Sequence, residues 1–346
     1  MTPASMTGSE VLRRHQIGEA VRDLQQRLAA AGYVPSGDDA GVFGAGTETA
    51  LRAFQEARGI RVDGISGPET WAALVESGFA LGDRMLYESS PNLRGDDVAD
   101  LQHRLNVLGF DAGREDGILG RQSGLALREF QRNTGLAVDG ILGPETLDAL
   151  GRVGNTPAQG SVASVREREE LRHPRRLEDH RVYVAVAPEF QTLGDVVGRA
   201  LSGAGAQTIT DLSGEDDSTI AGRANQYRAD LFLGVRAGDR SGCRCHYFAT
   251  GAFRSEAGFR IAAAVQAELD RVLGPRPGAA EESGPCGRTF AILRETQMAA
   301  VVCEPVGERD VEAMGALVNA VADVGAAIAR GVQRGIEEQP KEDDPA

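Results

Sequence analysis

Lysine is almost absent from this chain. Lys341 is the only lysine among 346 residues, so arginine carries nearly all of the positive side-chain charge. Acidic residues outnumber lysine and arginine by 51 to 37, which gives a formal net charge of −14. An acidic protein is repelled by nucleic-acid phosphates and by anionic membrane surfaces. We therefore expect no nucleic-acid partner.

Long apolar runs are also missing. No segment reaches the roughly 18 apolar residues that a membrane-spanning helix needs. The first fifteen residues, MTPASMTGSEVLRRH, lack the continuous apolar stretch of a secretory signal. From these two absences we expect no membrane span and a cytoplasmic location.

Two stretches of the chain read almost alike. VDGISGPETWAAL occupies 62–74 and VDGILGPETLDAL occupies 138–150, and the preceding GEAVRDLQQRLAAAGY (18–33) matches GDDVADLQHRLNVLGF (95–110). Apolar residues at helical spacing predict amphipathic helices, while Asp-Gly and Gly-Pro-Glu are typical of a tight turn and a helix start. Each unit therefore reads as three short helices, in which these Asp, Gly and Pro residues are mainly structural.

The second half has a different pattern, in which β-type runs alternate with helical segments. These runs are RVYVAVA (181–187), AQTIT (206–210), DLFLGV (230–235), CRCHYFA (243–249) and AAVVCE (299–304). This alternation predicts an open α/β sheet covered on both faces, with a site at the carboxyl ends of its strands. The fold class is thus two small three-helix domains followed by an α/β domain. The expected boundaries are a flexible N-terminus (1–17), two helical domains (18–80 and 92–154), a linker (155–180), the α/β domain (181–335) and a disordered acidic tail (336–346).

The recurring sequence motifs of the helical units resemble those of a known family. The patterns LQ..L...G, DG.FG..T..A...FQ and DG..G..T...L resemble the peptidoglycan-binding domain family, a three-helix module. The second unit keeps EDGILGRQSGLALREFQ, whereas the first has Ala40 in place of the first Asp of its pattern. The resemblance implies peptidoglycan or its precursors as partner, without saying which fragment binds.

The second half resembles zinc-dependent N-acetylmuramoyl-L-alanine amidases of the type-3 fold. The matching segments are RANQYRADLFLGVRAGD (223–239) and FAILRETQMAAVVCEPVGERD (290–310). Within that resemblance, Glu304 matches the catalytic carboxylate. The sequence departs from the family at its metal ligands: VAPEF (186–190) lacks the first His, only Glu189 lies near the place of the second ligand, and Arg236 replaces the third.

An arginine at a former ligand position changes the expected chemistry. Catalytic zinc needs about three protein ligands and an open water position, and a guanidinium, which is permanently protonated, cannot bind a cation. We therefore expect no metal cofactor, a vestigial Glu304, and a degenerate cleft formed by Glu189 and Arg236. Arg236 has three alternatives: a buried ion pair with Glu304, contact with an anionic ligand, or an exposed position at the sheet edge.

All four cysteines lie in the second half, at 243, 245, 286 and 303. Without an export signal we expect reduced thiols. On a strand, Cys243 and Cys245 share one face, and His246 points to the other. Buried thiols are the favoured interpretation, and a structural metal or a redox pair is the alternative.

Three functional hypotheses follow. The first is a noncatalytic cytoplasmic protein. LYESSPNLRGDDVADLQHRLNVLGF (86–110) and GRTFAILRETQM (287–298) resemble an actinobacterial subgroup of amidase homologues with degenerate zinc ligands, and this resemblance implies regulation of peptidoglycan synthesis through contact with a cytosolic precursor enzyme. The second is an active amidase that cleaves the bond between N-acetylmuramic acid and L-alanine. The third is a peptidoglycan sensor without an enzyme partner.

Overall fold

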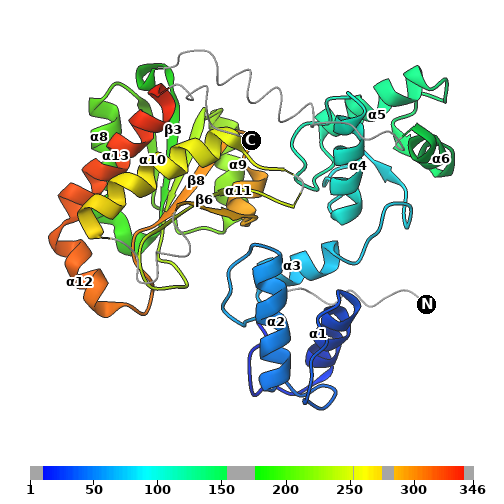
Figure 1. Ribbon diagram of the computed structural model, residues 1–346, viewed down its shortest axis with the longest axis horizontal. Coiled ribbons are helices and arrows are strands. Elements are labelled where there is room, and N and C mark those ends of the chain that lie inside the picture. Colours follow the sequence, from blue (N-terminus) through cyan, green and yellow to red (C-terminus); the bar gives the residue numbers. More distant parts are fainter. Residues whose placement is uncertain (1–10, 154–175, 252, 275–283, 339–346) are drawn as a thin grey trace. The chain divides into compact units, whose positions relative to one another are not determined.

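The computed structural model describes residues 11–153, 176–251, 253–274 and 284–338 (Figure 1). The chain separates into two compact units, Met1–Val165 and Arg166–Ala346. The first contains both helical repeats, and the second contains the α/β sheet. This division agrees with the change of pattern in the sequence.

Each repeat has the three helices that its spacing predicts. In the first they are α1 (Glu19–Ala30), α2 (Ala45–Ala57) and α3 (Pro68–Glu76), and in the second they are α4 (Asp96–Val107), α5 (Arg121–Asn133) and α6 (Pro144–Val153). The second repeat also pairs β1 (Leu86–Tyr87) with β2 (Ile141–Leu142) in antiparallel register. Each repeat has its own small core, built around Phe54 in the first and Phe130 in the second. The duplicated sequence therefore encodes two separate hydrophobic cores.

Four buried glutamines hold the turns of the repeats, and sequence reasoning did not single them out. In the first repeat, Gln25 Nε2 donates to the Asp39 and Val42 carbonyls and to Thr47 Oγ1, and Gln25 Oε1 accepts from Gly41 N. The same arrangement, a side-chain amide clamped between a turn and the next helix, recurs at three further glutamines, Gln55, Gln102 and Gln131. We call these four sites the glutamine clamps.

The glutamine clamps explain why Asp-Gly occurs at the equivalent position of both repeats. Gly64 and Gly140 have φ values of 73° and 76°, a left-handed conformation that glycine adopts at little cost. Their amide N–H groups donate to Gln55 and Gln131, while Asp63 and Asp139 accept from the same glutamines. The turn residues are thus structural, as their spacing predicts.

The α/β unit has a six-stranded mixed sheet. Its strands are β3 (Arg181–Val186), β4 (Gln207–Asp211), β5 (Leu231–Val235), β6 (Arg244–Phe248), β7 (Cys286–Arg288) and β8 (Ala299–Glu304), in the spatial order β4-β3-β5-β8-β6-β7. All neighbouring pairs are parallel except β6 and β8. Five strands lie where their composition predicts; the short β7 was not predicted.

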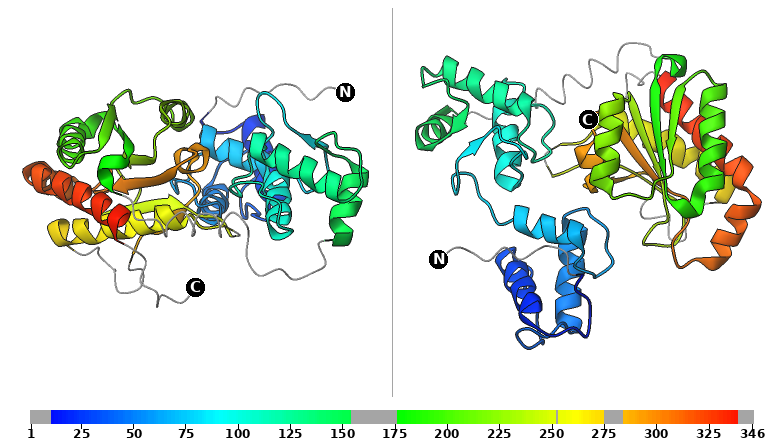
Figure 2. Two further views of the ribbon diagram at one scale, coloured as in Figure 1. Left: turned by 90° about the horizontal axis from the view of Figure 1, so that it is seen from above. Right: turned by 180° about the vertical axis from the view of Figure 1, so that it is seen from behind.

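Helices cover both faces of this sheet (Figure 2). On one face, α8 (Gln191–Gly203), α10 (Glu256–Leu273) and α13 (Val321–Glu337) pack around the main core. On the other lie α9 (Asp217–Tyr227) and α11 (Ala291–Glu295), which contact each other. The segment 310–332, which reads as one closing helical stretch, contains two helices, α12 (Val311–Asn319) and α13, with an 83° bend between them.

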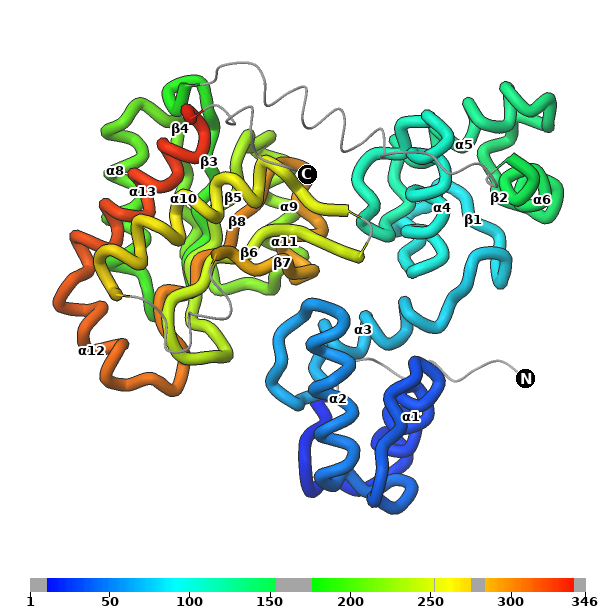
Figure 3. Tube along the Cα trace, viewed as in Figure 1, coloured from blue at the N-terminus to red at the C-terminus, as the bar shows by residue number. Residues whose placement is uncertain are grey.

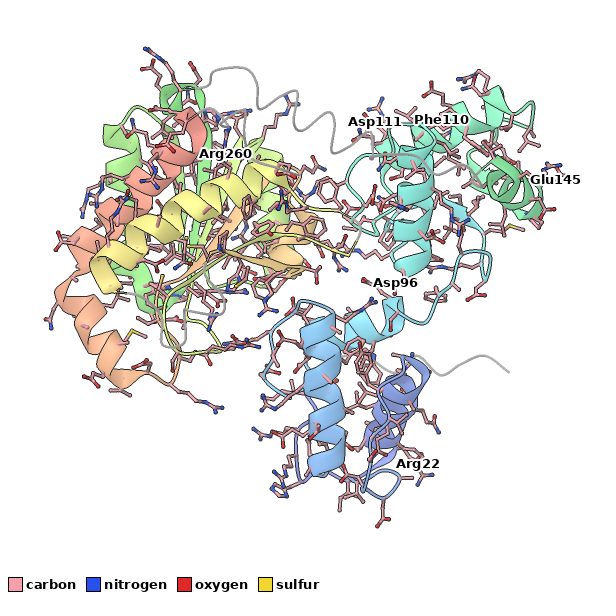
Figure 4. The ribbon with its side chains drawn as sticks, in the orientation of Figure 1. Arg22, Asp96, Phe110, Asp111, Glu145 and Arg260 are labelled. Carbon is pink, nitrogen blue, oxygen red and sulfur yellow. The ribbon has the colours of Figure 1, made fainter. Side chains whose placement is uncertain are left out.

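Three predicted boundaries are wrong by a few residues, because apolar side chains beside them are buried. Leu12 is 3% exposed and pairs with Ser66, so 11–17 belongs to the first repeat. Leu177, in the 3-10 turn η1 (Leu177–Asp179), lies in the α/β core, so the end of the expected linker is part of that unit. Helix α13 continues through Ile336, whose carbonyl accepts from Arg260 on α10, labelled in Figure 4. The remaining parts of the expected N-terminus, linker and tail lie outside the described residues.

Helices α10 and α13 pack closely enough to require glycine. An added Cβ at Gly331 on α13 would lie 2.4 Å from Val265 Cα on α10, so backbone would have to move. We expect Gly331→Ala to lower the free energy of unfolding by about 1–3 kcal/mol, measured by urea denaturation followed by circular dichroism. Gly315→Ala, on α12 with no neighbour within 4 Å, is the control and should stabilise by about 0.5–1 kcal/mol. Equal effects at both sites would contradict this account.

In the described part of the chain, no single helix has the length and apolar composition needed to cross a membrane, although the bent pair α12 and α13 together meet that criterion.

Candidate functional site

The carboxyl ends of three neighbouring parallel strands form one edge of the sheet, where the sequence places its candidate residues. Strands β3, β5 and β8 are adjacent (Figure 3), and Glu189, Arg236 and Glu304 follow or end them in that order. The last residue of β8, Glu304, is 4% exposed. A carboxylate this deeply buried needs partners for its oxygens.

Both carboxylate oxygens of Glu304 are held by side chains. His246 Nε2 lies 2.9 Å from Oε2, and Arg236 Nε donates to Oε1 at 3.2 Å. Since an ionised carboxylate only accepts hydrogen bonds, Nε2 of His246 carries the proton in this contact. Gly238 allows the close approach, because a Cβ there would lie 2.8 Å from Oε2.

The role of His246 was missed in the sequence. Its imidazole points away from Cys243 and Cys245, as strand alternation predicts, but the face to which it points is the one that carries Glu304. The antiparallel register of β6 and β8 pairs Arg244 with Glu304, so His246 is the diagonal neighbour of Glu304 on that face. The pattern of β6 gives the face but not the register, and only the register brings the two together.

Of the three alternatives for Arg236, the structure shows the ion pair with Glu304. The guanidinium is 28% exposed, contacts Asp217 at 3.4 Å on its outer side, and stacks on Phe290 with its Cζ 4.3 Å from the ring centre. An arginine with a carboxylate on either side and an aromatic ring beneath is firmly placed. We call Asp217, Arg236, Glu304 and His246 the charged chain.

Glu189 does not take part in the charged chain. It lies in the 3-10 turn η2 (Pro188–Phe190) after β3 and is exposed, and no hydrogen bond or ion pair to it occurs among the described residues. The sequence places it at the correct edge of the sheet, but the turn directs Phe190 rather than Glu189 into the core. Of the residues expected together, Arg236 and Glu304 are in contact, His246 joins them, and Glu189 stays apart.

The electrostatic environment favours a charged Glu304. Burial raises the pKa of this carboxyl, but the hydrogen bond from His246 and the charges of His246 and Arg236 outweigh burial, so the pKa is lowered. Burial lowers the pKa of His246, whereas interactions with the Cys286 thiol and with Glu304 raise it further than burial lowers it. The pair is thus stabilised as carboxylate and imidazolium.

These shifts predict a maximum of stability in mildly acidic solution. A lowered carboxyl pKa stabilises the fold above the unfolded value near 4.5, and this contribution is lost as pH falls through the folded pKa. A raised histidine pKa stabilises below the unfolded value near 6.5 and is lost as pH rises through the folded pKa. We expect urea denaturation to show the contribution of the pair, on the order of 1 kcal/mol, between these limits. In His246→Gln, the free energy of unfolding should no longer fall as pH rises above neutrality. If its dependence on pH is the same as in the native chain, the raised pKa does not belong to His246.

The cysteines divide into a buried group and a half-buried one. Cys243, Cys245 and Cys303 lie in the core, and the sulfurs of Cys245 and Cys303 are 3.7 Å apart without a bond. Burial, together with the neighbouring Cys303 thiol, raises the pKa of Cys245. Cys286, on β7, is partly exposed. Free buried thiols are therefore what the structure shows for three of the four.

Comparison with known proteins finds a matching domain family and several similar proteins. Residues 17–74 and 94–150 match the family described as "Putative peptidoglycan binding domain". The N-acetylmuramoyl-L-alanine amidase CwlM of Mycobacterium tuberculosis is 40% identical over 173 residues, 47% of this chain and 43% of that protein. A probable N-acetylmuramoyl-L-alanine amidase of Bacillus licheniformis is 34% identical over 158 residues, 41% of this chain and 45% of that protein. The chain thus spans less than half the length of these curated relatives.

This chain is a relative of N-acetylmuramoyl-L-alanine amidases that carries two peptidoglycan-binding-type domains. Among solved structures, the amidase Ami1 from Mycobacterium smegmatis has a TM-score of 0.37 and 15% identity, covering 45% of this chain and 96% of that one. Helical domains followed by a sheet with helices on both faces are the arrangement that the sequence predicts.

The residues at the edge of this amidase-like sheet do not fit a zinc ion. Zinc requires deprotonated donors with free lone pairs. Here Glu304 has one oxygen bound by a guanidinium and the other by the protonated Nε2 of His246. Within the described ranges, no three His, Cys, Asp or Glu side chains come together in a way that could hold a metal ion.

Proposed function

We propose that this chain binds peptidoglycan or its precursors through its two repeats. We further propose that its amidase-like domain, which has lost zinc-dependent hydrolysis, acts as a binding and regulatory surface in peptidoglycan metabolism. The partner in this proposal is a cytosolic enzyme of precursor synthesis, and the protein works in the cytoplasm. The repeats, which match a peptidoglycan-binding family, support the first part.

The observation that carries the second part is the ion pair between Arg236 and Glu304. A hydrolase of this kind needs a carboxylate free to accept a proton from a metal-activated water. In this chain the carboxylate that the resemblance assigns to that task is neutralised by Arg236 and His246. A permanently charged guanidinium beside it repels a divalent cation.

Metal analysis together with an activity assay tests the loss of hydrolysis. The purified full chain is dialysed against zinc, its metal content is measured, and it is incubated with muropeptides that retain the bond between N-acetylmuramic acid and L-alanine. We expect less than stoichiometric zinc and no cleavage above a boiled control. One zinc per chain with release of peptide would overturn the proposal.

Active amidase is the second candidate, favoured by the name of the CwlM relative. Under that alternative, cleavage would require Glu304, so Glu304→Gln would abolish it, while Glu312→Gln, at an exposed position on α12, would leave it unchanged. Under our proposal, neither variant alters a rate that is already at background.

Fractionation and binding assays test location and partner. We expect the chain in the cytosolic fraction, and we expect it to retain a precursor-synthesis enzyme from that fraction more strongly than it binds intact sacculi. Exclusive recovery with sacculi would favour a sensor without an enzyme partner, and recovery outside the cell would favour the hydrolase.

A further inference from the structure

Cys286 lies beside the charged chain and has no role in the proposed function. Strands β6 and β7 are neighbours in the sheet (Figure 3) and run parallel. Their register pairs Cys286 directly with His246. Residues directly opposite each other on neighbouring strands project from the same face of the sheet. The thiol, the imidazole and the Glu304 carboxylate therefore share the face covered by α9 and α11.

The imidazole is positioned between the other two groups. His246 is 2% exposed, its Nε2 is bound to Glu304, and its ring meets the edge of Phe290 at a centroid distance of 5.3 Å. Its second nitrogen, Nδ1, is buried and makes no hydrogen bond of ordinary geometry with the described residues. The interaction of the ring with Cys286 is nevertheless the largest of those that raise the pKa of His246. A buried imidazole thus has one nitrogen fixed by a carboxylate and the other available to a thiol.

We propose that Cys286 is a reactive thiolate paired with His246, that Glu304 orients the imidazole, and that the thiolate forms mixed disulfides with low-molecular-weight disulfides. The proton of the thiol resides on His246. The Cys286 sulfur attacks one sulfur of the disulfide, a new S–S bond forms as the old one breaks, and the second half leaves as a thiolate. No metal takes part, and the inference does not depend on the loss of hydrolysis.

Cys286 is the cysteine of the four whose location in the fold suits a reactive thiol. It lies on β7, the edge strand of the sheet, and is partly exposed. Cys243, Cys245 and Cys303 are at most 3% exposed. A thiolate next to a protonated histidine reacts with disulfides, whereas a buried thiol in apolar surroundings does not. A group attached at Cys286 would lie against the charged chain.

The reaction of the native full chain with an aromatic disulfide, in the presence of a metal chelator, tests the proposal. We expect one fast-reacting thiol per chain, which mass spectrometry of the peptides assigns to Cys286. Its rate should reach half of its maximum below about pH 7.5, as for histidine-paired cysteines, rather than near the ordinary value of about 8.5. Cys286→Ser should abolish the fast phase, and the matched Cys243→Ser should retain it.

His246→Gln tests the pairing itself. At pH 6 the gain in thiolate exceeds the loss of intrinsic nucleophilicity, so we expect this variant to react about tenfold more slowly than the native chain. If the native profile rises with a midpoint near about 8.5, the proposal is wrong. It is also wrong if the fast thiol maps to a cysteine other than 286. Both of these outcomes are read on the native chain, so they decide the matter even where a variant fails to fold.

Discussion

Replacement of Glu304 by alanine is expected to destabilise the α/β unit by about 3–5 kcal/mol, because it leaves His246 and Arg236 without the carboxylate that compensates them. Hydrogen exchange on peptides from β6 and β8 measures this effect directly. Protection in both strands should fall together, since they share the register that places the two charged groups side by side.

Asp217→Asn provides the matched control. It removes the outer carboxylate of the same charged chain, but Asp217 is one-third exposed, so the cost should stay below about 1 kcal/mol. The contrast also bears on function. Residues kept for catalysis often destabilise a fold, and their removal is then neutral or stabilising. A stable Glu304→Ala protein would therefore contradict a structural role for Glu304 and revive the hydrolase hypothesis.

Gln25→Leu is expected to lower the stability of the first repeat by about 2–4 kcal/mol. Leucine has a similar volume, but it cannot satisfy the buried Gly41 N–H or replace the three bonds that the Gln25 amide donates. A domain of this size has a small core, so such a loss is a large part of its stability.

The chain offers a selective probe and a neighbouring control for this prediction. Trp71 is the only tryptophan and packs against the core of the first repeat, so its fluorescence in urea follows that repeat alone. Gln26→Leu makes the same change one residue further along α1, at an exposed position. It should change the free energy of unfolding by no more than about 0.5 kcal/mol. Equal midpoints for the two variants would show that the clamp contributes nothing.

Much of this architecture follows from local sequence signals. Helical spacing predicts the three helices of each repeat, and runs of β-type composition predict five of the six strands. Strand β7 escapes notice because Cys286–Arg288 is only three residues long and none of its side chains is fully buried. A run so short has no periodicity to detect.

The candidate site was only partly accessible from the sequence. Arg236 and Glu304 were identified through the resemblance to the amidase family. The strand pattern adds that both lie at the carboxyl ends of parallel strands, which meet at one edge of the sheet. His246 lies on a strand of opposite direction, so its proximity to Glu304 depends on the β6–β8 register. The glutamine clamps could not be predicted for a related reason. Nothing in the local sequence distinguishes a glutamine that is buried and hydrogen-bonded to a turn from one that is exposed to solvent.

The glutamine clamps have a consequence for how ligand preference evolves in these domains. The glutamines and turn residues by which the family is recognised make hydrogen bonds within each repeat. These residues therefore indicate that a repeat folds, and they give no information about which ligand it binds. Under the proposed function, ligand selectivity would reside at positions where the two copies differ, such as Tyr33-Val34 against Phe110-Asp111, the latter labelled in Figure 4. Duplication of such a domain supplies a second surface that can mutate independently, while the hydrogen bonds that hold its turns stay the same.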